Sequence, residues 1–183
     1  SSVSHMGIVG LGLATVSVDG LNGAVFQMFG HGIMTALFFS SVGYIYDRTH
    51  TKIIAELGGL SRVMPVASTY FIVAAMASMG IPFLASFWGE LMVFIAAFKT
   101  YPFRGALAVC ALVVSALFML RMIQHTFYGP KNEKFAHLPD VPFGLGIPRM
   151  ILLIVLVVFG LYPTLMFDMI ESASVPFFNG ILQ

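Results

Sequence analysis

Long apolar segments, separated by short polar or glycine- and proline-bearing stretches, make up most of the chain. A membrane-spanning helix needs about 20 apolar residues, and most of these segments reach or approach that length. Their apolar runs are continuous rather than alternating, which argues against the strands of a closed barrel. We therefore expect an all-α membrane protein with helical segments at residues 3–18, 21–46, 62–79, 83–98, 106–127 and 147–167, followed by an amphipathic tail at 168–183.

The composition supports a membrane environment for residues 1–167. Hydrophobic residues make up 58% of the chain, charged residues 9%, and the mean hydropathy is +0.94. A soluble domain has roughly a quarter of its residues charged. The net charge of +1 gives no hint of nucleic acid or of a strongly acidic partner, and the apolar composition makes lipid the expected surroundings. The single cysteine, Cys110, predicts neither a disulfide framework nor a metal cluster.

The start of the chain, SSVSHMG, has no initiator methionine and no basic stretch before an apolar one. It is typical neither of a signal peptide nor of a natural start, so we expect a piece of a longer chain. The cationic residues of the loops divide too evenly between the two sides to orient the bundle in the membrane.

Glu90 is the most informative residue, because it is the only ionisable one in GIPFLASFWGELMVF, residues 80–94. A charged side chain at the centre of a bilayer helix costs roughly 2.5–3.5 kcal/mol and usually faces a cavity or a partner. Gly80 and Pro82 predict a break in the helix close to this charge, and unwound backbone is tolerated in a membrane where it is buried in protein or lines a wet cavity. Glu90 is therefore a candidate functional residue. The alternatives are a shallow position near the head groups or a structural pair.

A second polar feature lies within the segment 21–46. Gln27, His31 and Thr35 recur every four residues and share one helix face. Histidine can exchange protons near neutral pH, and hydroxyl or amide neighbours can hold a water beside it. The pattern favours a proton-transfer stripe, with a neutral histidine packed between helices as the alternative.

Arg121 and His125 share a face near the end of the segment 106–127. They are candidates either for a proton path or for ordinary snorkelling to the membrane interface. We assign no role to His5, because it lies at the very start of the chain. The sequence holds no phosphate-binding glycine loop, no zinc or iron–sulfur spacing and no nucleophile elbow.

Several linked motifs stand out along the chain: SSVSHMG, QMFGHG, YDRTHT with the GGL that follows, and MGIPFLASFWGEL. Together they resemble the antiporter-like membrane subunits of respiratory complex I, in the NADH-quinone oxidoreductase family. The group also includes subunits of cation/proton antiporter complexes and of membrane-bound hydrogenases. Glutamate at position 90 is similar to the M-type (subunit 4 type) class, whereas the L- and N-type classes commonly carry lysine there. The resemblance covers residues 1–162 and corresponds to the C-terminal part of a full subunit.

This resemblance implies an architecture. Family members contain two five-helix repeats of inverted topology, each with one discontinuous helix. The chain would supply the second repeat and one further helix, with Glu90 on the discontinuous helix. The resemblance also implies that Glu90 carries protons on a central hydrophilic axis, with His31 as a neighbour, in response to remote redox chemistry.

The resemblance implies partners and cofactors as well. L-type and N-type subunits would lie beside this one in an NADH-quinone oxidoreductase-type complex. NAD(H) or another donor, flavin, iron–sulfur clusters and quinone would be held by partner subunits, while this chain would hold no cofactor and perform no redox chemistry. Its location would be an energy-transducing membrane, whether bacterial or archaeal plasma membrane, thylakoid or mitochondrial inner membrane. A multisubunit cation/proton antiporter, a membrane-bound hydrogenase and a purely structural anchor remain alternatives.

Overall fold

The structure, a computed structural model, describes residues 1–130 and 132–181. In this part of the chain all regular secondary structure is helical, which confirms the expected all-α fold. The α-helices are α1 (Ser2–Ala14), α2 (Val18–Thr49), α3 (Pro65–Ser78), α4 (Ala85–Thr100), α5 (Pro102–Phe127), α6 (Phe143–Leu161) and α7 (Thr164–Ile181). Short 3-10 helices are η1 (Ile54–Glu56), η2 (Leu60–Arg62) and η3 (Glu133–Phe135).

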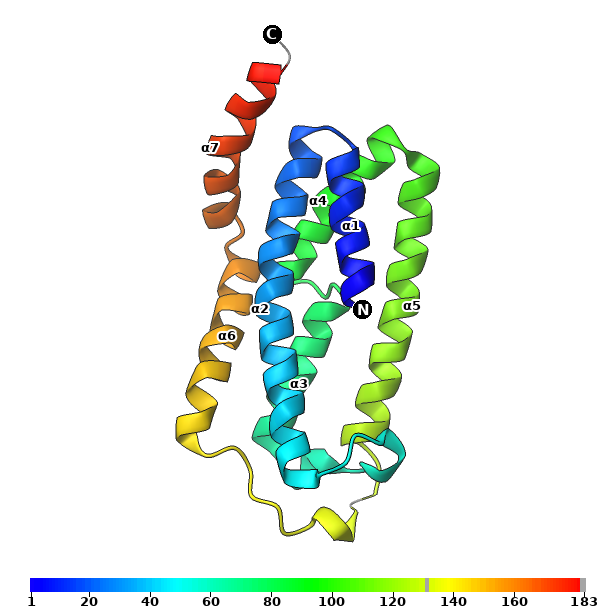
Figure 1. The fold of residues 1–183 in the computed structure, drawn as a ribbon, viewed down its shortest axis with the longest axis vertical. Helices are drawn as coiled ribbons and strands as arrows, with labels where there is room; N and C mark the ends of the chain where they lie inside the picture. Colours follow the sequence, from blue (N-terminus) through cyan, green and yellow to red (C-terminus); the bar gives the residue numbers. More distant parts are fainter. Residues whose placement is uncertain (131, 182–183) are drawn as a thin grey trace.

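Helix α2 is the central element, and helices α1, α3, α4, α6 and α7 all pack against it (Figure 1). It contains 32 residues, so its length is about 48 Å. Its start is well defined, because the Ser17 hydroxyl accepts a 3.1 Å hydrogen bond from the Gly20 N–H and Asp19 places a negative charge in the first turn. The helix ends at His50, which adopts the left-handed conformation with φ of 51°.

Helices α3 and α4 lie end to end along α2, with an irregular connection at mid-height (Figure 1). Two residues of this connection, Gly80 and Phe83, have positive φ values of 68° and 76°. Pro82 between them has no N–H to continue a helix. The predicted segments 62–79 and 83–98 are therefore the two halves of one discontinuous helix.

The N-terminus of α3 is stabilised by a residue distant in the sequence. Pro65 occupies the first turn, where its missing N–H is no loss. The Asp140 carboxylate accepts hydrogen bonds from the N–H groups of Val66 at 2.7 Å and Ala67 at 3.1 Å. Asp140 thus caps α3 and attaches the connection between α5 and α6 to the bundle.

The C-terminal part differs from the sequence expectation. The predicted helix 147–167 is interrupted at Tyr162 and Pro163, so that α6 ends at Leu161 and a separate helix, α7, begins at Thr164. Proline has no N–H and disfavours a helical conformation in the residue before it; Tyr162 has φ of −123° and ψ of 66°. The expected tail is helical as far as residue 181, and residues 182–183 lie outside the described part of the chain.

Three of the described helices, α2, α5 and α6, are long and apolar enough to cross a membrane. Helices α3 and α4, with 14 and 16 residues, are each too short, but together they follow α2 over most of its length (Figure 1). Helices α5 and α6 expose many large apolar side chains, as a lipid-facing surface does; examples are Val114, Leu117, Ile151 and Ile154.

Candidate functional site

Glu90 lies in the second turn of α4, next to the break in the discontinuous helix, and only 2% of its surface is exposed. Its Oε2 atom lies against Gly80, and a Cβ atom at residue 80 would collide with that oxygen. The positive φ of Gly80 also favours glycine at this position. The break therefore provides the space that the carboxylate occupies.

Glycines bring the backbones of α2 and α4 together at this point. A Cβ atom on Gly89 would lie 2.6 Å from the backbone N and 2.8 Å from the Cα of Gln27. One turn away on each side, a Cβ atom on Gly23 would lie 2.8 Å from the Val93 N, and one on Gly30 would lie 3.1 Å from the Ser86 N. Small residues permit such close helix approach. The crossing places the Gln27 side chain beside Glu90.

Two side chains contact the same oxygen of Glu90. Gln27 Nε2 donates a 3.1 Å hydrogen bond to Glu90 Oε1, and His5 Nδ1 lies 3.2 Å from that oxygen. Gln27 Nε2 also lies 3.2 Å from His5 Nδ1. His5 and Gln27 are 2% and 0% exposed. A buried carboxylate needs polar partners of this kind, because burying an unpaired charge is costly.

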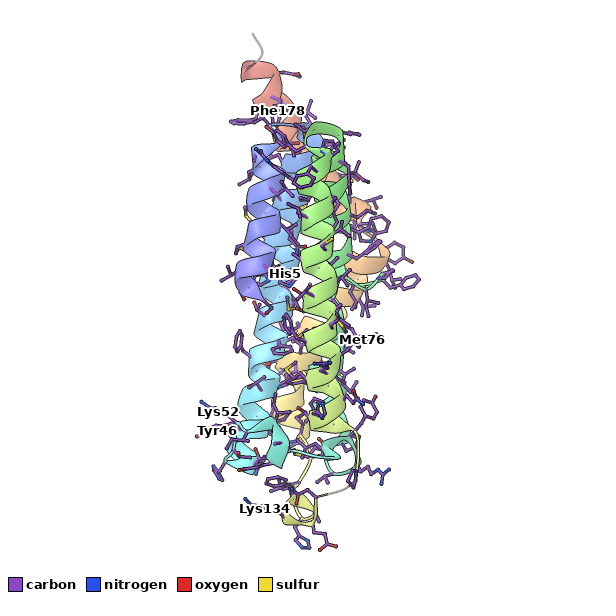
Figure 2. The ribbon with its side chains drawn as sticks, turned by 90° about the vertical axis from the view of Figure 1, so that its right-hand side faces the viewer. His5, Tyr46, Lys52, Met76, Lys134 and Phe178 are labelled. Atoms are coloured by element: carbon purple, nitrogen blue, oxygen red, sulfur yellow. The ribbon has the colours of Figure 1, made fainter. Side chains whose placement is uncertain are left out.

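The polar contacts continue from His5 to α3. His5 Nε2 lies 3.2 Å from the hydroxyl oxygen of Ser78, the last residue of α3. The N-terminal end of α1 lies at mid-height beside the break between α3 and α4 (Figure 1), and Figure 2 labels His5 of α1 at this depth. One line of polar groups, Glu90, His5 and Ser78, thus joins α4, α1 and α3 inside the bundle.

This arrangement can hold a proton in two places. If Glu90 is ionised and His5 is an imidazolium with hydrogen on both ring nitrogens, Nδ1 donates to Oε1. If the carboxyl group carries the proton, Nδ1 is available as an acceptor. The two states differ by one proton transfer over the 3.2 Å between Oε1 and Nδ1, and Gln27 can donate to the oxygen in either state. The site is chemically suited to loading and releasing a proton.

The predicted stripe on α2 divides into residues inside and outside this site. Gln27 binds Glu90 directly. The His31 ring lies beside the His5 ring, with centroids 5.1 Å apart, and His31 Nδ1 is buried without a hydrogen-bond partner among the described residues. Thr35 instead donates to carbonyl groups of its own helix, at His31 (2.7 Å) and Gly32 (3.1 Å). The neighbour of Glu90 on the α1 side is therefore His5, with His31 behind it.

Arg121 and His125 lie elsewhere. Both are exposed in the last two turns of α5, at the end of the bundle that contains η1 and η2. His125 lines a surface pocket with residues of η1 and with Tyr128. Within the described residues, no hydrogen bond links either side chain to Glu90. Their exposure fits snorkelling to the interface, and a role in proton transfer stays a prediction.

Sequence reasoning missed His5. It is the most deeply buried of the histidines and the one that contacts Glu90. A signal was available, since His5 lies within the predicted segment 3–18 and an ionisable residue inside a membrane segment is a functional candidate by default. Its position near the start of the chain was the reason it received no role. Among the residues that the structure describes, no group of three or more His, Cys, Asp or Glu could hold a metal ion.

The fold and this site define an all-helical membrane protein that holds an ionisable carboxyl–imidazole pair at a broken helix inside the bundle. Such a pair, buried at membrane depth, is typical of proteins that move ions or protons. The chain belongs to the family of NADH:quinone oxidoreductase and Mrp antiporter transmembrane proteins, whose family model matches residues 1–118.

Curated relatives agree with this family. The chain is 35% identical to NAD(P)H-quinone oxidoreductase chain 4 1 of Nostoc sp. over 96% of its own length and 34% of that protein. It is 32% identical to NADH-quinone oxidoreductase subunit M of Rickettsia bellii, with coverages of 97% and 37%. It is 36% identical to F(420)H(2) dehydrogenase subunit M of Methanosarcina mazei, with coverages of 95% and 35%. These names confirm the resemblance to the M-type class. The chain spans about a third of the length of these relatives.

Solved structures share the fold. Respiratory complex I from Thermus thermophilus contains a chain with a TM-score of 0.83 and 26% identity, covering 93% of this chain and 37% of that one. The archaeal membrane-bound sulfane sulfur reductase gives a TM-score of 0.77 with 26% identity and coverages of 86% and 32%. The Mrp complex from Dietzia sp. gives a TM-score of 0.86 with 22% identity and coverages of 97% and 41%, which shows a common fold.

Proposed function

We propose that this chain is the C-terminal part of a proton-translocating membrane subunit of a complex I-type oxidoreductase, and that Glu90 takes up and releases the proton. The observation that carries the proposal is the 3.2 Å contact between Glu90 Oε1 and His5 Nδ1, both groups nearly fully buried next to the break between α3 and α4. The curated relatives, which are named as subunits of quinone oxidoreductase and F(420)H(2) dehydrogenase complexes, support the same assignment.

In the proposed mechanism the proton moves between Glu90 Oε1 and His5 Nδ1, while Gln27 holds the carboxylate in place. His5 Nε2 faces the Ser78 hydroxyl, which can donate or accept as the imidazole changes its protonation. Two unit charges 4 Å apart interact by about 4 kcal/mol at an effective dielectric constant of 20. A charge that arrives near the site or leaves it can therefore change which group holds the proton.

The wider setting of the site rests on the family resemblance. The chain would supply the second inverted repeat and one following helix, and L-type and N-type subunits would be neighbours in the membrane arm. NAD(H) or another donor, flavin, iron–sulfur clusters and quinone would be bound by partner subunits, so that this chain itself performs no redox chemistry. His31, beside His5, would be the next carrier along the axis. The membrane would be an energy-transducing one.

A subunit of a cation/proton antiporter complex is the second candidate, because the family includes Mrp antiporter proteins and the Dietzia Mrp complex has the same fold. The relatives described above that exceed 30% identity are named as oxidoreductase or dehydrogenase subunits, which favours the first candidate. Redox-driven proton movement by the assembled complex would support the first candidate. Cation-driven proton exchange without electron transfer would support the second.

The test is Glu90→Gln in the complete subunit within its assembled complex. Glutamine keeps the shape of the side chain and cannot carry the proton, so we expect proton translocation per electron to fall by at least about tenfold while the complex still assembles. Acidification in proteoliposomes measures proton translocation, and the rate of quinone reduction in the same preparation measures electron transfer. Glu171→Gln is the matched control, because Glu171 undergoes the same chemical change on the exposed surface of α7. An unchanged proton-to-electron ratio in Glu90→Gln would contradict the proposal.

A further inference from the structure

We propose that Arg48 and Arg149 form a binding site for the phosphate group of an anionic phospholipid, at the end of the bundle where α2 ends and α6 begins. The two arginines come from helices about a hundred residues apart, and both meet the ring of Tyr44. The guanidinium carbon of each lies 5.3 Å from the centroid of that ring. This distance is within the range of cation–π attraction.

The location fits a lipid head group. Arg48 lies in the last turn of α2, Arg149 lies in the second turn of α6, and both are partly exposed. Lys52 and Tyr46, labelled near one end of the bundle in Figure 2, pack together at the same end, with the ammonium 4.8 Å from the ring centroid. Tyrosines and cations concentrate where membrane helices meet the head groups.

Neither arginine of this pair forms a salt bridge with a carboxylate within the described residues, although Asp47 directly precedes Arg48 in the sequence. In residues 1–130 and 132–181, the ion pairs within 4 Å are His5–Glu90 and Lys99–Asp19, and neither includes Arg48 or Arg149. The nearby acid Asp140 is occupied by backbone N–H groups of α3 and of Val141. Two guanidinium cations held against one ring repel each other, and an anion bound by both would remove that repulsion.

The two arginine side chains differ in the hydrogen bonds that they already make within the protein. Arg149 donates through Nη1 to the Leu145 carbonyl at 2.5 Å and through Nη2 to the Ser40 carbonyl at 2.8 Å, which fixes its plane. Its Nε is buried and has no partner among the described residues. Arg48 donates no hydrogen bond within the same residues, so its whole guanidinium fork is available. Arginine forks match phosphate oxygens in a bidentate geometry.

The membrane setting of the two helices favours a lipid over free phosphate. Helices α2 and α6, which carry the arginines, are both long and apolar enough to cross a membrane, so that arginines near the helix ends lie where head groups meet the apolar core. An amphiphile with a negative head group can contact the arginines there while its apolar chains extend beside the helices. Free phosphate has no apolar part to place in the membrane.

The experiment uses the complete subunit in its assembled complex, in nanodiscs of phosphatidylcholine, titrated with phosphatidylglycerol and followed by native mass spectrometry. We expect Arg48→Gln/Arg149→Gln to bind phosphatidylglycerol at least about tenfold more weakly, because each cation near the head groups contributes to binding. Arg48→Gln alone should weaken binding about fivefold. Arg104→Gln is the matched control, because the Arg104 guanidinium carbon lies 4.7 Å from the centroid of the Tyr101 ring and no second arginine of the described residues lies over that ring.

Equal binding of phosphatidylglycerol by the double variant and the Arg104→Gln control would overturn the proposal. Inorganic phosphate is the second probe, added to the complex in nanodiscs of phosphatidylcholine alone at constant ionic strength. Arginine-dependent phosphate binding as tight as that of phosphatidylglycerol would overturn the assignment to lipid. If loss of the Ser40 contact prevents assembly of the double variant, Arg48→Gln decides the matter, because it leaves both carbonyl contacts of Arg149 intact.

Discussion

Gln27 and Glu90 are joined by a 3.1 Å hydrogen bond at a point where the backbone of α2 lies against Gly89, the residue before the glutamate. The partner of the carboxylate is therefore determined by how closely two helices pack, rather than by the reach of long side chains. Both groups are almost completely buried. Any change that separates α2 from α4 should disturb the charge as well as the packing.

Gly89→Ala tests this dependence on packing. The added methyl group would lie 2.6 Å from the backbone N and 2.8 Å from the Cα of Gln27, and neither atom can rotate away. We expect the unfolding free energy of the complete protein to fall by about 1–3 kcal/mol, as in overpacked cores. Unfolding in detergent micelles measures this change.

Gly32→Ala on α2 is the matched control, because a Cβ atom there meets nothing within 4 Å. Alanine favours a helix over glycine by up to about 1 kcal/mol, so this variant should be neutral or slightly more stable. Equal stability of the two variants would show that α2 and α4 can separate without loss.

His5→Asn tests the role of the imidazole in proton transfer. Asparagine can keep a hydrogen bond to Glu90 Oε1, but it cannot titrate. We expect proton translocation per electron to decrease about tenfold, with the subunit still assembled. Proton movement in proteoliposomes gives the readout. Ser78→Ala removes the outer partner of His5 and should cause a smaller loss. Full translocation by His5→Asn would mean that His5 serves packing.

Asp140→Ala tests the cap of α3. The substitution leaves the N–H groups of Val66 and Ala67 without their acceptor. Loss of a helix cap costs roughly 1–2 kcal/mol, so the thermal midpoint of the complete protein should decrease. Asp168→Ala removes a carboxylate from an exposed position of α7 and should have little effect. A similar midpoint for both variants would show that the connection between α5 and α6 does not hold α3 in place.

Local sequence patterns predicted the features that depend on one segment. Length and hydropathy gave the long helices α2 and α5, and the apolar context of Glu90 drew attention to its charge. Gly80 and Pro82 predicted the break in the discontinuous helix because both residues restrict the backbone directly.

Features that depend on tertiary packing were harder to predict. The contact of His5 with Glu90 spans 85 positions and arises because α1 packs beside the break, which no local pattern records. Pro163 was overlooked as a helix break because the apolar residues continue on both sides of it. The i,i+4 spacing of Gln27, His31 and Thr35 correctly predicted that they share a helix face. It did not predict which of them reach the site, and Thr35 does not, because its hydroxyl donates to the His31 carbonyl of its own helix.

Because Gly80 and Glu90 are in contact, the residue tolerated at one position depends on the residue at the other. Any side chain at residue 80 would compete with Oε2 for the same space, and the backbone there already favours glycine. A variant with a larger residue at 80 therefore has room only for a shorter acid, or for no acid, at 90. Second-site changes that compensate for a Gly80 substitution would be expected at Glu90 itself. The residue at the helix break and the residue that carries the charge should therefore change together in related sequences.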